Sequence, residues 1–436
     1  MSRVAVVGGG LAGIAAALRC ADAGLDVTLF ESRGALGGLT HSFRRGDLSV
    51  DNGQHVFLRC CTAYIGLLER LGVRDKVHLQ DRLAIPVRSA RTGPEHWLRR
   101  GRLAAPYHLS ESVLAYRHVS MRERIAFAQA ALALRDIDPV AVDDRSFGDW
   151  LRERRQSART VETLWDLIGV ATLNSCADNA SLSLAATVFQ VGLLSDASAS
   201  DLGWSKVPLS ELHGEAARSA LSNVDLRLNA KVRSLSTGWR VDGESFDQVV
   251  LAVPPPVAER LLPAGAVNLT AGWSERLGNS PIINVHVHYD RQVLDQPFVA
   301  AIDSPLQWVF DRTTQAGVSN GQYVAVSLSA ADDLVGLPTG QLRARMLPAL
   351  AALLPSARGA RILDFFVTRE RTATFRPAPG TAALRPAATT AATGLFLAGA
   401  WTATGWPATM EGAVRSGDAA AAALLSQRKP IKEAAA

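Results

Sequence analysis

The chain has 436 residues, of which 48% are hydrophobic and 20% are charged, an ordinary balance for a soluble globular enzyme. Its length exceeds what one simple core supports, so we expect two intertwined domains. The 46 basic and 41 acidic residues give a net charge of +5, and the arginines are scattered rather than clustered. This pattern argues against nucleic acid as a partner.

The cysteines, the first residues and the apolar runs bear on where the protein works. None of the four cysteines forms a C-x-x-C motif, and the chain starts on an apolar strand without a secretory signal. We therefore expect free thiols and a cytoplasmic protein. No apolar run reaches the ~18 residues that span a bilayer.

His286 and His288 have no cluster of cysteines or carboxylates beside them, so we expect no metal site.

The first thirty residues predict a strand, a glycine-rich turn, a helix and a second strand. The apolar run at 4–7 suits a strand buried on both faces, and the alanine-rich stretch at 11–23 suits a helix. A second strand at 26–30 ends at Glu31. This order is typical of a dinucleotide-binding unit.

The glycines between the first strand and the helix follow G-x-G-x-x-G spacing. Gly8 permits the tight turn, and Gly10 lets a pyrophosphate approach the backbone at the helix N-terminus. Gly13 lets the helix pack closely on the sheet. A carboxylate at Glu31 can accept both ribose hydroxyls of an adenosine.

The end of the chain indicates which dinucleotide binds. A strand at 395–398, a turn at Gly399 and a helix at 407–425 resemble the closing flavin segment of the amine-oxidase and phytoene-desaturase superfamily. A second glycine pair, Gly37 and Gly38, also suits a flavoprotein. In that superfamily the last helix points its N-terminus at the flavin, where its partial positive charge stabilises the reduced ring.

The expected cofactor is therefore non-covalent FAD. The superfamily usually has Arg after the second glycine pair and Asp after the closing turn, whereas this chain has Leu39 and Ala400. The residues that we expect to contact FAD are Gly8, Gly10, Leu11, Ala12, Gly13, Glu31, Ser32, Gly37, Gly38, Gly53, Val232, Gly399, Ala400, Pro407, Ala408, Thr409 and Met410.

Four stretches carry a closer resemblance, over nearly the whole chain. They are "VDNGQHVFLRCCTAYIGLLERLG" at 50–72, "LAAPYHL" at 103–109, "WSKVPLSELH" at 204–213 and "GWPATMEGAVRSG" at 405–417. Together they resemble the hydroxysqualene dehydroxylases, also called squalene-associated FAD-dependent desaturases, of bacterial hopanoid pathways. The resemblance implies that hydride from reduced FAD replaces the hydroxyl of a C30 isoprenoid, hydroxysqualene, giving squalene and water.

The tetrad Asn52-Gly53-Gln54-His55 is the most specific part of that resemblance. We expect Gly53 to let the backbone approach the flavin ring, and Asn52 and Gln54 to bind the substrate hydroxyl or the flavin edges. His55 has an ordinary pKa in the range that suits a proton donor to the leaving oxygen. The alternative is a polar turn whose side chains bond to their own backbone.

The predicted fold is α/β, with a discontinuous Rossmann-type FAD-binding domain and an inserted α+β substrate domain, as in the amine-oxidase and phytoene-desaturase superfamily. The FAD domain is assigned to 1–90, 215–260 and 386–428. The substrate domain is assigned to 91–214, with helices at 121–137 and behind Ser146, and 261–385, with an alternating strand at 281–290. We expect the tail, 429–436, to be disordered.

A C30 isoprenoid is nearly insoluble in water, so we expect it to enter from a bilayer. Peripheral contact at the inner face of the membrane is expected through the apolar side chains of Leu184, Val188, Phe189, Leu193 and Leu194, with flanking arginines. An ordinary core role for this segment is the alternative. Nothing in the sequence indicates an oligomeric state.

Other functions fit parts of the pattern. A related FAD-dependent isoprenoid or carotenoid desaturase needs the same apolar tunnel, with hydride moving in the opposite direction. An amine oxidase would want an aromatic cage and a lysine near the flavin. A prenyl-binding escort protein shares the architecture without redox chemistry, but the intact glycine motif and Glu31 favour an enzyme.

Overall fold

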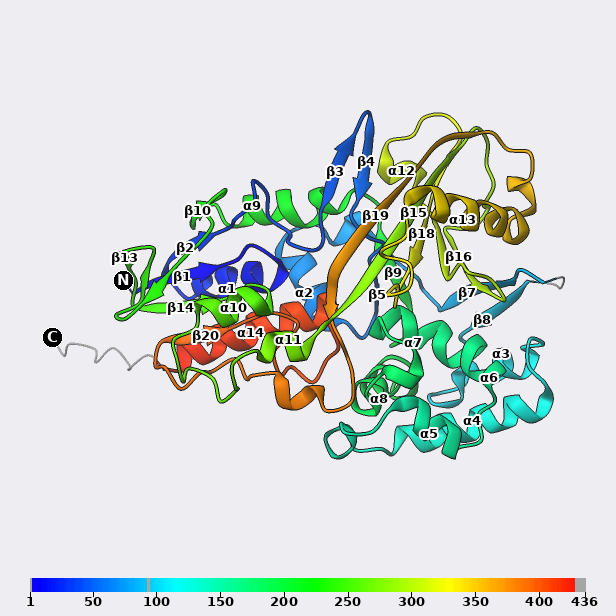
Figure 1. The fold of residues 1–436 in the computed structure, drawn as a ribbon, viewed down its shortest axis with the longest axis horizontal. Helices are drawn as coiled ribbons and strands as arrows, with labels where there is room; N and C mark the ends of the chain where they lie inside the picture. Colours follow the sequence, from blue (N-terminus) through cyan, green and yellow to red (C-terminus); the bar gives the residue numbers. More distant parts are fainter. Residues whose placement is uncertain (1, 92–94, 428–436) are drawn as a thin grey trace.

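The computed structural model describes residues 2–91 and 95–427 (Figure 1). The predicted tail, 429–436, lies outside these residues. The chain folds into two regions, one around a five-stranded sheet and one around a seven-stranded sheet with a group of helices beside it. The first region lies at the end of the molecule that carries the N-terminus.

The five-stranded sheet is parallel throughout. Its apolar strands are buried on both faces, as the run at 4–7 predicts. In spatial order the strands are β10 (Asp225–Arg227), β2 (Asp26–Phe30), β1 (Arg3–Val7), β14 (Gln248–Leu251) and β20 (Leu395–Leu397). Strands far apart in the sequence thus lie side by side, and the predicted Rossmann-type α/β fold is confirmed.

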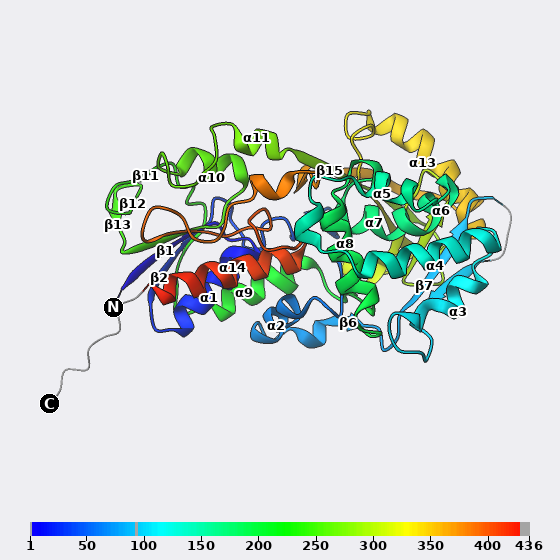
Figure 2. The same cartoon turned by 90° about the horizontal axis from the view of Figure 1, so that it is seen from below.

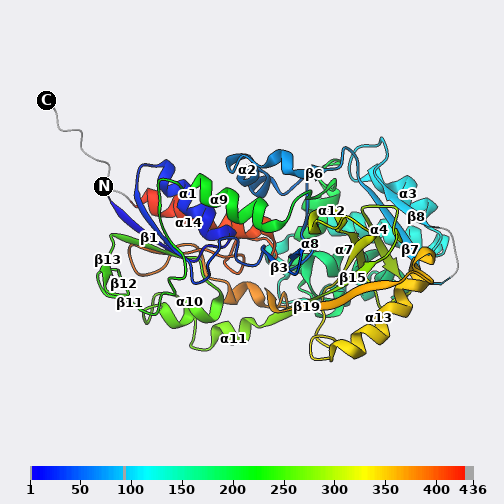
Figure 3. The ribbon, with the colours of Figure 1, turned by 90° about the horizontal axis from the view of Figure 1, so that it is seen from above.

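Helices α1 (Leu11–Asp22) and α14 (Met410–Ser426) lie side by side on one face of this sheet (Figures 2 and 3). Small residues allow the close approach, since a Cβ on Gly417 would lie 2.1 Å from the Ala12 carbonyl oxygen. Helix α14 begins at Met410 rather than at the predicted position 407. The Thr409 side chain caps it by accepting a hydrogen bond from the Gly412 amide at 3.1 Å.

The other face of the parallel sheet is covered by elements from the middle of the chain. The core there includes Ala5, Val7, Val249 and Leu251 from the strands. The covering elements are the antiparallel strands β11 (Leu235–Ser236), β12 (Arg240–Val241) and β13 (Glu244–Ser245) and the helices α10 (Pro255–Leu261) and α11 (Trp273–Leu277).

The seven-stranded sheet is mostly antiparallel, with one parallel pair, β16 (Phe298–Ile302) and β7 (Ala84–Ser89). The predicted alternation in β15 (Asn279–Tyr289) is confirmed. Its alternate residues Ile283, Val285, Val287 and Tyr289 pack in a core with α13 (Thr339–Leu353), whereas Asn284 and His286 face the other way. In spatial order the strands are β19 (Ile362–Phe375), β15 (Asn279–Tyr289), β18 (Gln322–Leu328), β17 (Trp308–Asp311), β16 (Phe298–Ile302), β7 (Ala84–Ser89) and β8 (His96–Arg99). Strand β7 belongs to this sheet, although its residues fall within the segment 1–90 that the sequence analysis assigned to the FAD-binding domain.

Helices from the first half of the chain lie below this sheet in Figure 1. The predicted helix at 121–137 is α4 (Met121–Arg135), and the Ser146 side chain caps α5 (Phe147–Glu153) by accepting a hydrogen bond from the Asp149 amide. The main helices here are α3 (Ser110–Ala115), α4 (Met121–Arg135), α5 (Phe147–Glu153), α7 (Asp166–Leu173) and α8 (Leu182–Phe189).

The segment expected to contact a membrane lies in this helical core. Leu184 and Phe189 are each only 4% exposed. Val188, Leu193 and Leu194 are half-buried and pack against the same core. The predicted membrane contact through this segment is therefore wrong, and its apolar character is explained by packing. Within 2–91 and 95–427, no helix combines the length and apolarity needed to cross a bilayer.

Short elements carry the tetrad between the two regions. The hairpin β3 (Ser42–Arg45) and β4 (Leu48–Asp51) runs into Asn52, and β5 (Val56–Leu58) begins just after His55. Strand β5 pairs with β9 (Leu202–Ser205), which also pairs with β6 (Val77–Leu79). Helix α2 (Thr62–Arg70) follows and packs against α14.

Candidate active site

The glycine turn after β1 forms an open cradle at the N-terminus of α1. Gly8 has φ +109°, which only glycine adopts readily, and a Cβ on Gly13 would lie 1.8 Å from the Gly8 carbonyl oxygen. Gly10 precedes the helix and no side chain caps it. The amides of Leu11 and Ala12 open the helix, so the N-terminal donors face the cradle.

The second glycine pair closes this cradle from the other side. Gly37 has φ +111°, and its amide donates to the Gly9 carbonyl at 2.9 Å. A Cβ on Gly38 would lie 2.8 Å from the Gly10 Cα. Two stretches of bare backbone therefore face each other, which is the close approach that a pyrophosphate requires.

Glu31 lies at the end of β2 beside this cradle, and its side chain is buried. One carboxylate oxygen accepts from the Gly9 amide at 2.7 Å, and the other accepts from the Arg33 amide at 2.7 Å and from Ser32 Oγ at 3.1 Å. The Ala230 amide donates to the Glu31 carbonyl at 2.8 Å, which brings the buried Val232 segment to the same edge. The carboxylate is thus held where the glycine motif predicts it.

The closing segment is fixed by a buried arginine that the sequence reasoning missed. Gly399 follows β20, and its amide donates to Ser416 Oγ of α14 at 2.7 Å. The Arg385 guanidinium donates to the carbonyls of Ala400, Thr402 and Trp406, among others. Burial lowers the pKa of Arg385 to about 10. The turn leading through Pro407, Ala408 and Thr409 to α14 is therefore held from within by one cation.

Asn52 is used within the loop that carries it. Its Oδ1 accepts from the His41 amide at 3.1 Å and its Nδ2 donates to the Leu39 carbonyl at 2.9 Å. The amide thus joins the second glycine turn to the tetrad, as the polar-turn alternative predicts for this residue. Gln54 is half-buried, and its side chain forms no hydrogen bond with the described residues.

Two buried polar atoms lie beside Gly53 without a hydrogen-bond partner in the described part of the chain. They are Nε2 of His55 and Oδ1 of Asn284. A Cβ on Gly53 would lie 3.1 Å from His55 Nε2 and 3.8 Å from Asn284 Nδ2, so all three residues meet at one point. Asn284 comes from β15, and its Nδ2 donates to the Asn52 carbonyl at 3.2 Å. Buried groups of this kind normally have partners, so this point is a candidate binding position.

The imidazole of His55 differs from the sequence expectation. Burial, together with the positive charges of Arg312 and His41, lowers its pKa to about 4, and Asp51 and the Leu39 carbonyl act in the opposite direction. His55 is therefore uncharged at neutral pH. Once protonated, it is a stronger acid than an ordinary histidine.

Polar side chains of the seven-stranded sheet form a chain of hydrogen bonds that ends at the tetrad. Tyr323 Oη lies 2.7 Å from His286 Nδ1, and His286 Nε2 lies 3.0 Å from Thr368 Oγ1. Thr368 in turn donates to the Asn52 carbonyl at 3.4 Å. The alternation in β15 placed Asn284 and His286 on one face, which was the signal for this contact. The sequence did not indicate which element they would face.

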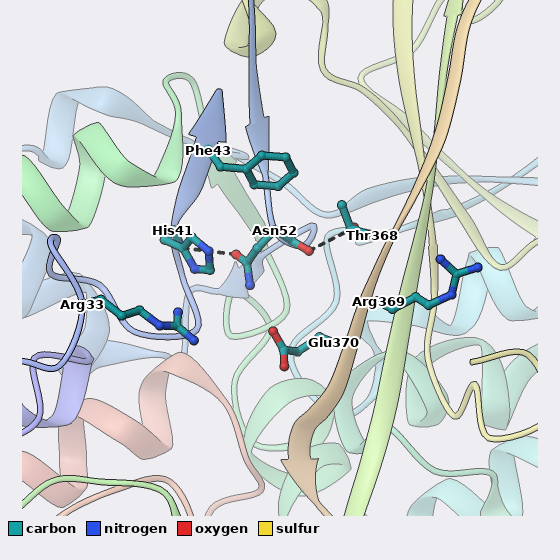
Figure 4. A pocket seen from close by; sticks show the side chains of 7 residues that line it. All are labelled: Arg33, His41, Phe43, Asn52, Thr368, Arg369 and Glu370. Carbon is teal, nitrogen blue, oxygen red and sulfur yellow. Dashed lines mark hydrogen bonds between the residues drawn. The ribbon is translucent and has the colours of Figure 1, made fainter. Parts of the chain in front are cut away.

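A pocket of about 350 Å³ opens between the loop after β2 and strand β19 (Figure 4). The side chains of Arg33 and Glu370 point into it from opposite sides, and Arg33 Nη1 donates to the Gly38 carbonyl at 3.3 Å. This arginine lies at the second glycine turn, where the chain has Leu39 instead of the usual arginine. The lining residues are Arg33, His41, Phe43, Asn52, Thr368, Arg369 and Glu370.

Comparisons with known proteins agree with this geometry. The flavin containing amine oxidoreductase family matches residues 11–425, so the chain belongs to that family. Hydroxysqualene dehydroxylase of Rhodopseudomonas palustris is 28% identical, covering 97% of this chain and 98% of the relative. Zeta-carotene desaturase of Synechocystis is 24% identical, covering 99% of both.

Solved structures show the same fold. A triple mutant of putrescine oxidase has a TM-score of 0.75 at 20% identity, covering 98% of this chain and 99% of that one. A putative protoporphyrinogen oxidase from Exiguobacterium has a TM-score of 0.71 at 19% identity, with the same coverage. The protein is an FAD-dependent oxidoreductase with a Rossmann-type cofactor domain. The bare-backbone cradle, the uncapped helix and Glu31 fit this cofactor.

Proposed function

We propose that the protein catalyses the reductive dehydroxylation of hydroxysqualene to squalene. Hydride takes the place of the hydroxyl group on carbon, and the hydroxyl group takes up a proton and leaves as water. Bound FAD, once reduced, supplies the hydride. Full-length similarity to two hydroxysqualene dehydroxylases, each 28% identical, supports this substrate.

The observation that carries the proposal is the unpartnered pair beside Gly53. An amide oxygen such as Asn284 Oδ1 accepts a hydrogen bond, and an imidazole nitrogen such as His55 Nε2 accepts or donates according to its protonation. A hydroxyl group can donate to one and accept from the other. A carotene is a hydrocarbon and would leave both atoms buried and unsatisfied, at a cost of about 1–3 kcal/mol each.

The chain's own residues would then divide the work at this point. Asn284 holds the hydroxyl, and protonated His55 donates to its oxygen as the carbon–oxygen bond breaks. Gly53 leaves the space that this approach needs, because a Cβ there would meet the His55 ring. The buried setting that lowers the pKa of His55 also makes its proton easy to release.

Product analysis tests the proposal. The protein is incubated anaerobically with chemically reduced FAD and hydroxysqualene, and the extract is analysed by mass spectrometry. We expect squalene, and deuterium in it when the flavin carries deuteride. Unchanged hydroxysqualene from a protein that has taken up reduced FAD would reject the substrate assignment.

The second candidate is the carotenoid desaturase, favoured by the relative that is 24% identical over 99% of both chains. It requires oxidised FAD and a hydrocarbon, so zeta-carotene with an electron acceptor is the matched assay. New conjugated double bonds, seen as a red shift in absorption, would favour this function. The likeness to putrescine oxidase is at 20% identity and supports the fold alone.

A further inference from the structure

Exposed apolar side chains gather on one part of the helical region. Of the large apolar side chains that are exposed in the described structure, most lie between residues 103 and 140, and few lie elsewhere. We call the following six the apolar face: Leu103, Tyr107, Leu114, Met121, Ile125 and Leu132. Each is 38% or more exposed, and four of them exceed half.

Helix α4 shows that this exposure is patterned. Met121, Ile125 and Leu132 are spaced by four and seven residues, which places them on one stripe of a helix with 3.6 residues per turn. The opposite stripe, with Ala130 and Leu134, packs into the core. The helix is thus apolar on two sides, and only one side is covered by protein.

Helix α3 extends the apolar face. The Arg124 guanidinium of α4 donates a hydrogen bond to the Leu114 carbonyl at 2.5 Å, so a side chain of α4 links the two helices. They lie next to each other at one end of the molecule in Figures 1 and 2. Leu103, Tyr107 and Leu114 precede α4 in the chain and are also exposed. Leu114 lies in α3, which contacts α4, and the turn that carries Tyr107 contacts α3.

The segment that carries the apolar face is rich in positive charge. Residues 99–135 contain seven arginines and two glutamates, a formal charge of +5 that equals the charge of the whole chain. Within the described residues, Arg102, Arg117 and Arg122 form no ion pair. A pocket of about 730 Å³ in this region has Arg82, Arg99, Arg100 and Arg102 in its lining, together with Glu111 and Trp97. The Arg99 guanidinium lies over the Trp97 ring, 4.2 Å from its centroid.

We propose that this face docks the protein on an anionic lipid bilayer. The apolar side chains enter the boundary between headgroups and acyl chains, while the unpaired arginines meet lipid phosphates. A second copy of the chain is a poorer occupant, because two such faces would bring like charges together. Docking of this kind depends on exposed side chains and charge, and not on which isoprenoid the active site takes.

Vesicle flotation with the FAD-loaded protein tests it at low ionic strength. We expect wild type to float with vesicles of phosphatidylcholine and phosphatidylglycerol, and much less with phosphatidylcholine alone. The Met121→Ser/Ile125→Ser/Leu132→Ser variant should bind anionic vesicles about tenfold or more weakly, because it loses apolar area from the interface. The matched control, Leu363→Ser, replaces an exposed leucine on β19 and should float like wild type.

A second variant separates charge from apolar contact. Arg102→Gln/Arg117→Gln/Arg122→Gln should abolish the preference for anionic vesicles and reduce binding about tenfold or more. Wild type that stays unbound with anionic vesicles, or a serine variant that floats as well as wild type, would overturn the proposal. So would a wild-type dimer in size-exclusion chromatography that the serine substitutions convert to a monomer, since another copy would then cover the face.

Discussion

Asp51 and Arg312 form a buried ion pair, with 2.5 Å between Asp51 Oδ2 and Arg312 Nη2. Asp51 is the last residue of β4, directly before the tetrad, and Arg312 follows β17 of the seven-stranded sheet. The other carboxylate oxygen accepts from Ser42 Oγ and from the Leu209 amide. The pair therefore fixes the start of the tetrad to the sheet that also carries Asn284.

The first prediction concerns this pair. Asp51→Ala leaves a buried guanidinium without its counter-charge, so we expect the free energy of unfolding to fall by about 3–5 kcal/mol. Urea denaturation measures this change. Asp22→Ala, which breaks the exposed pair with Arg70, is the control and should cost about 0–1 kcal/mol. Equal effects would show that Arg312 finds another partner.

The second prediction concerns Glu31. We expect Glu31→Ala to weaken FAD binding by about 1–3 kcal/mol, because the ribose hydroxyls lose a charged acceptor. Titration of apoprotein with FAD, followed by flavin fluorescence, measures the dissociation constant. Glu69→Ala on α2 removes an exposed carboxylate outside the cradle and serves as the control. Unchanged affinity in the Glu31 variant would contradict the assigned role.

The third prediction concerns retention of FAD. Leu39 and Ala400 cannot make the polar contacts that the superfamily usually has, so we expect this protein to lose FAD readily on dialysis. Arg33, at the same turn, is the side chain best placed to compensate. Arg33→Ala should then lose FAD faster still, whereas Arg44→Ala, an exposed arginine on β3, should not. Full occupancy of the Arg33 variant after dialysis would contradict this.

The nucleotide-binding end could be read from the sequence because its signals are local. The strand at 26–30 was predicted with the bounds that β2 has, and α1 ends at Asp22, close to the predicted end. Gly8 takes a positive φ, and a Cβ on Gly13 would collide with the Gly8 carbonyl, so both glycines are explained within the turn itself. No distant residue is needed to explain them, so spacing along the chain was sufficient.

The candidate site could be read only in part, because its contacts are long-range. Asn284 meets Gly53 only because the loop that carries the tetrad packs against the seven-stranded sheet, and Arg385 reaches the closing loop from outside it. The pKa of His55 depends on burial by both regions, which sequence does not report. The apolar segment at 184–194 was misassigned because a buried helix and a membrane-facing helix have the same composition.

The fourth prediction concerns acid stability. Burial lowers the pKa of both His213 and His286 to about 3. At pH values between this lowered pKa and the ordinary pKa of histidine, the unfolded chain therefore binds protons that the folded chain does not. Stability is therefore lost as pH falls, by about 1.4 kcal/mol per pH unit for each histidine below about pH 6.

Unfolding at several pH values tests this. His286→Gln should reduce the slope of stability against pH by about 1.4 kcal/mol per unit, since one titrating group is removed. Thr368→Val removes the hydroxyl beside His286 without removing a titrating group, so it should lower stability and keep the slope. An unchanged slope in the His286 variant would show that this imidazole titrates alike in both states.

The last prediction concerns the proton donor. Loss of hydroxide from carbon needs a proton on the leaving oxygen, and general-acid catalysis contributes about 10²–10⁴-fold. We expect His55→Ala to keep the fold and FAD but to lower turnover at least about 10²-fold. His286→Ala and His288→Ala should lower turnover less. Both ring nitrogens of His286 already have partners, Tyr323 and Thr368, and His288 Nε2 bonds to the Asn320 carbonyl at an exposed edge.

Asn284→Ala should raise KM more than it lowers kcat, because it removes an acceptor for the bound hydroxyl.

The pH profile distinguishes an acid from a binding group. The reactive form of His55 is the protonated one, and its pKa of about 4 means that this form increases as pH falls. Above that pKa, kcat/KM should rise about tenfold for each unit of decrease in pH, for as long as the protein stays folded. His55→Gln should lose this dependence. A glutamine variant with the wild-type rate and profile would make the tetrad a binding turn, with the proton supplied by water.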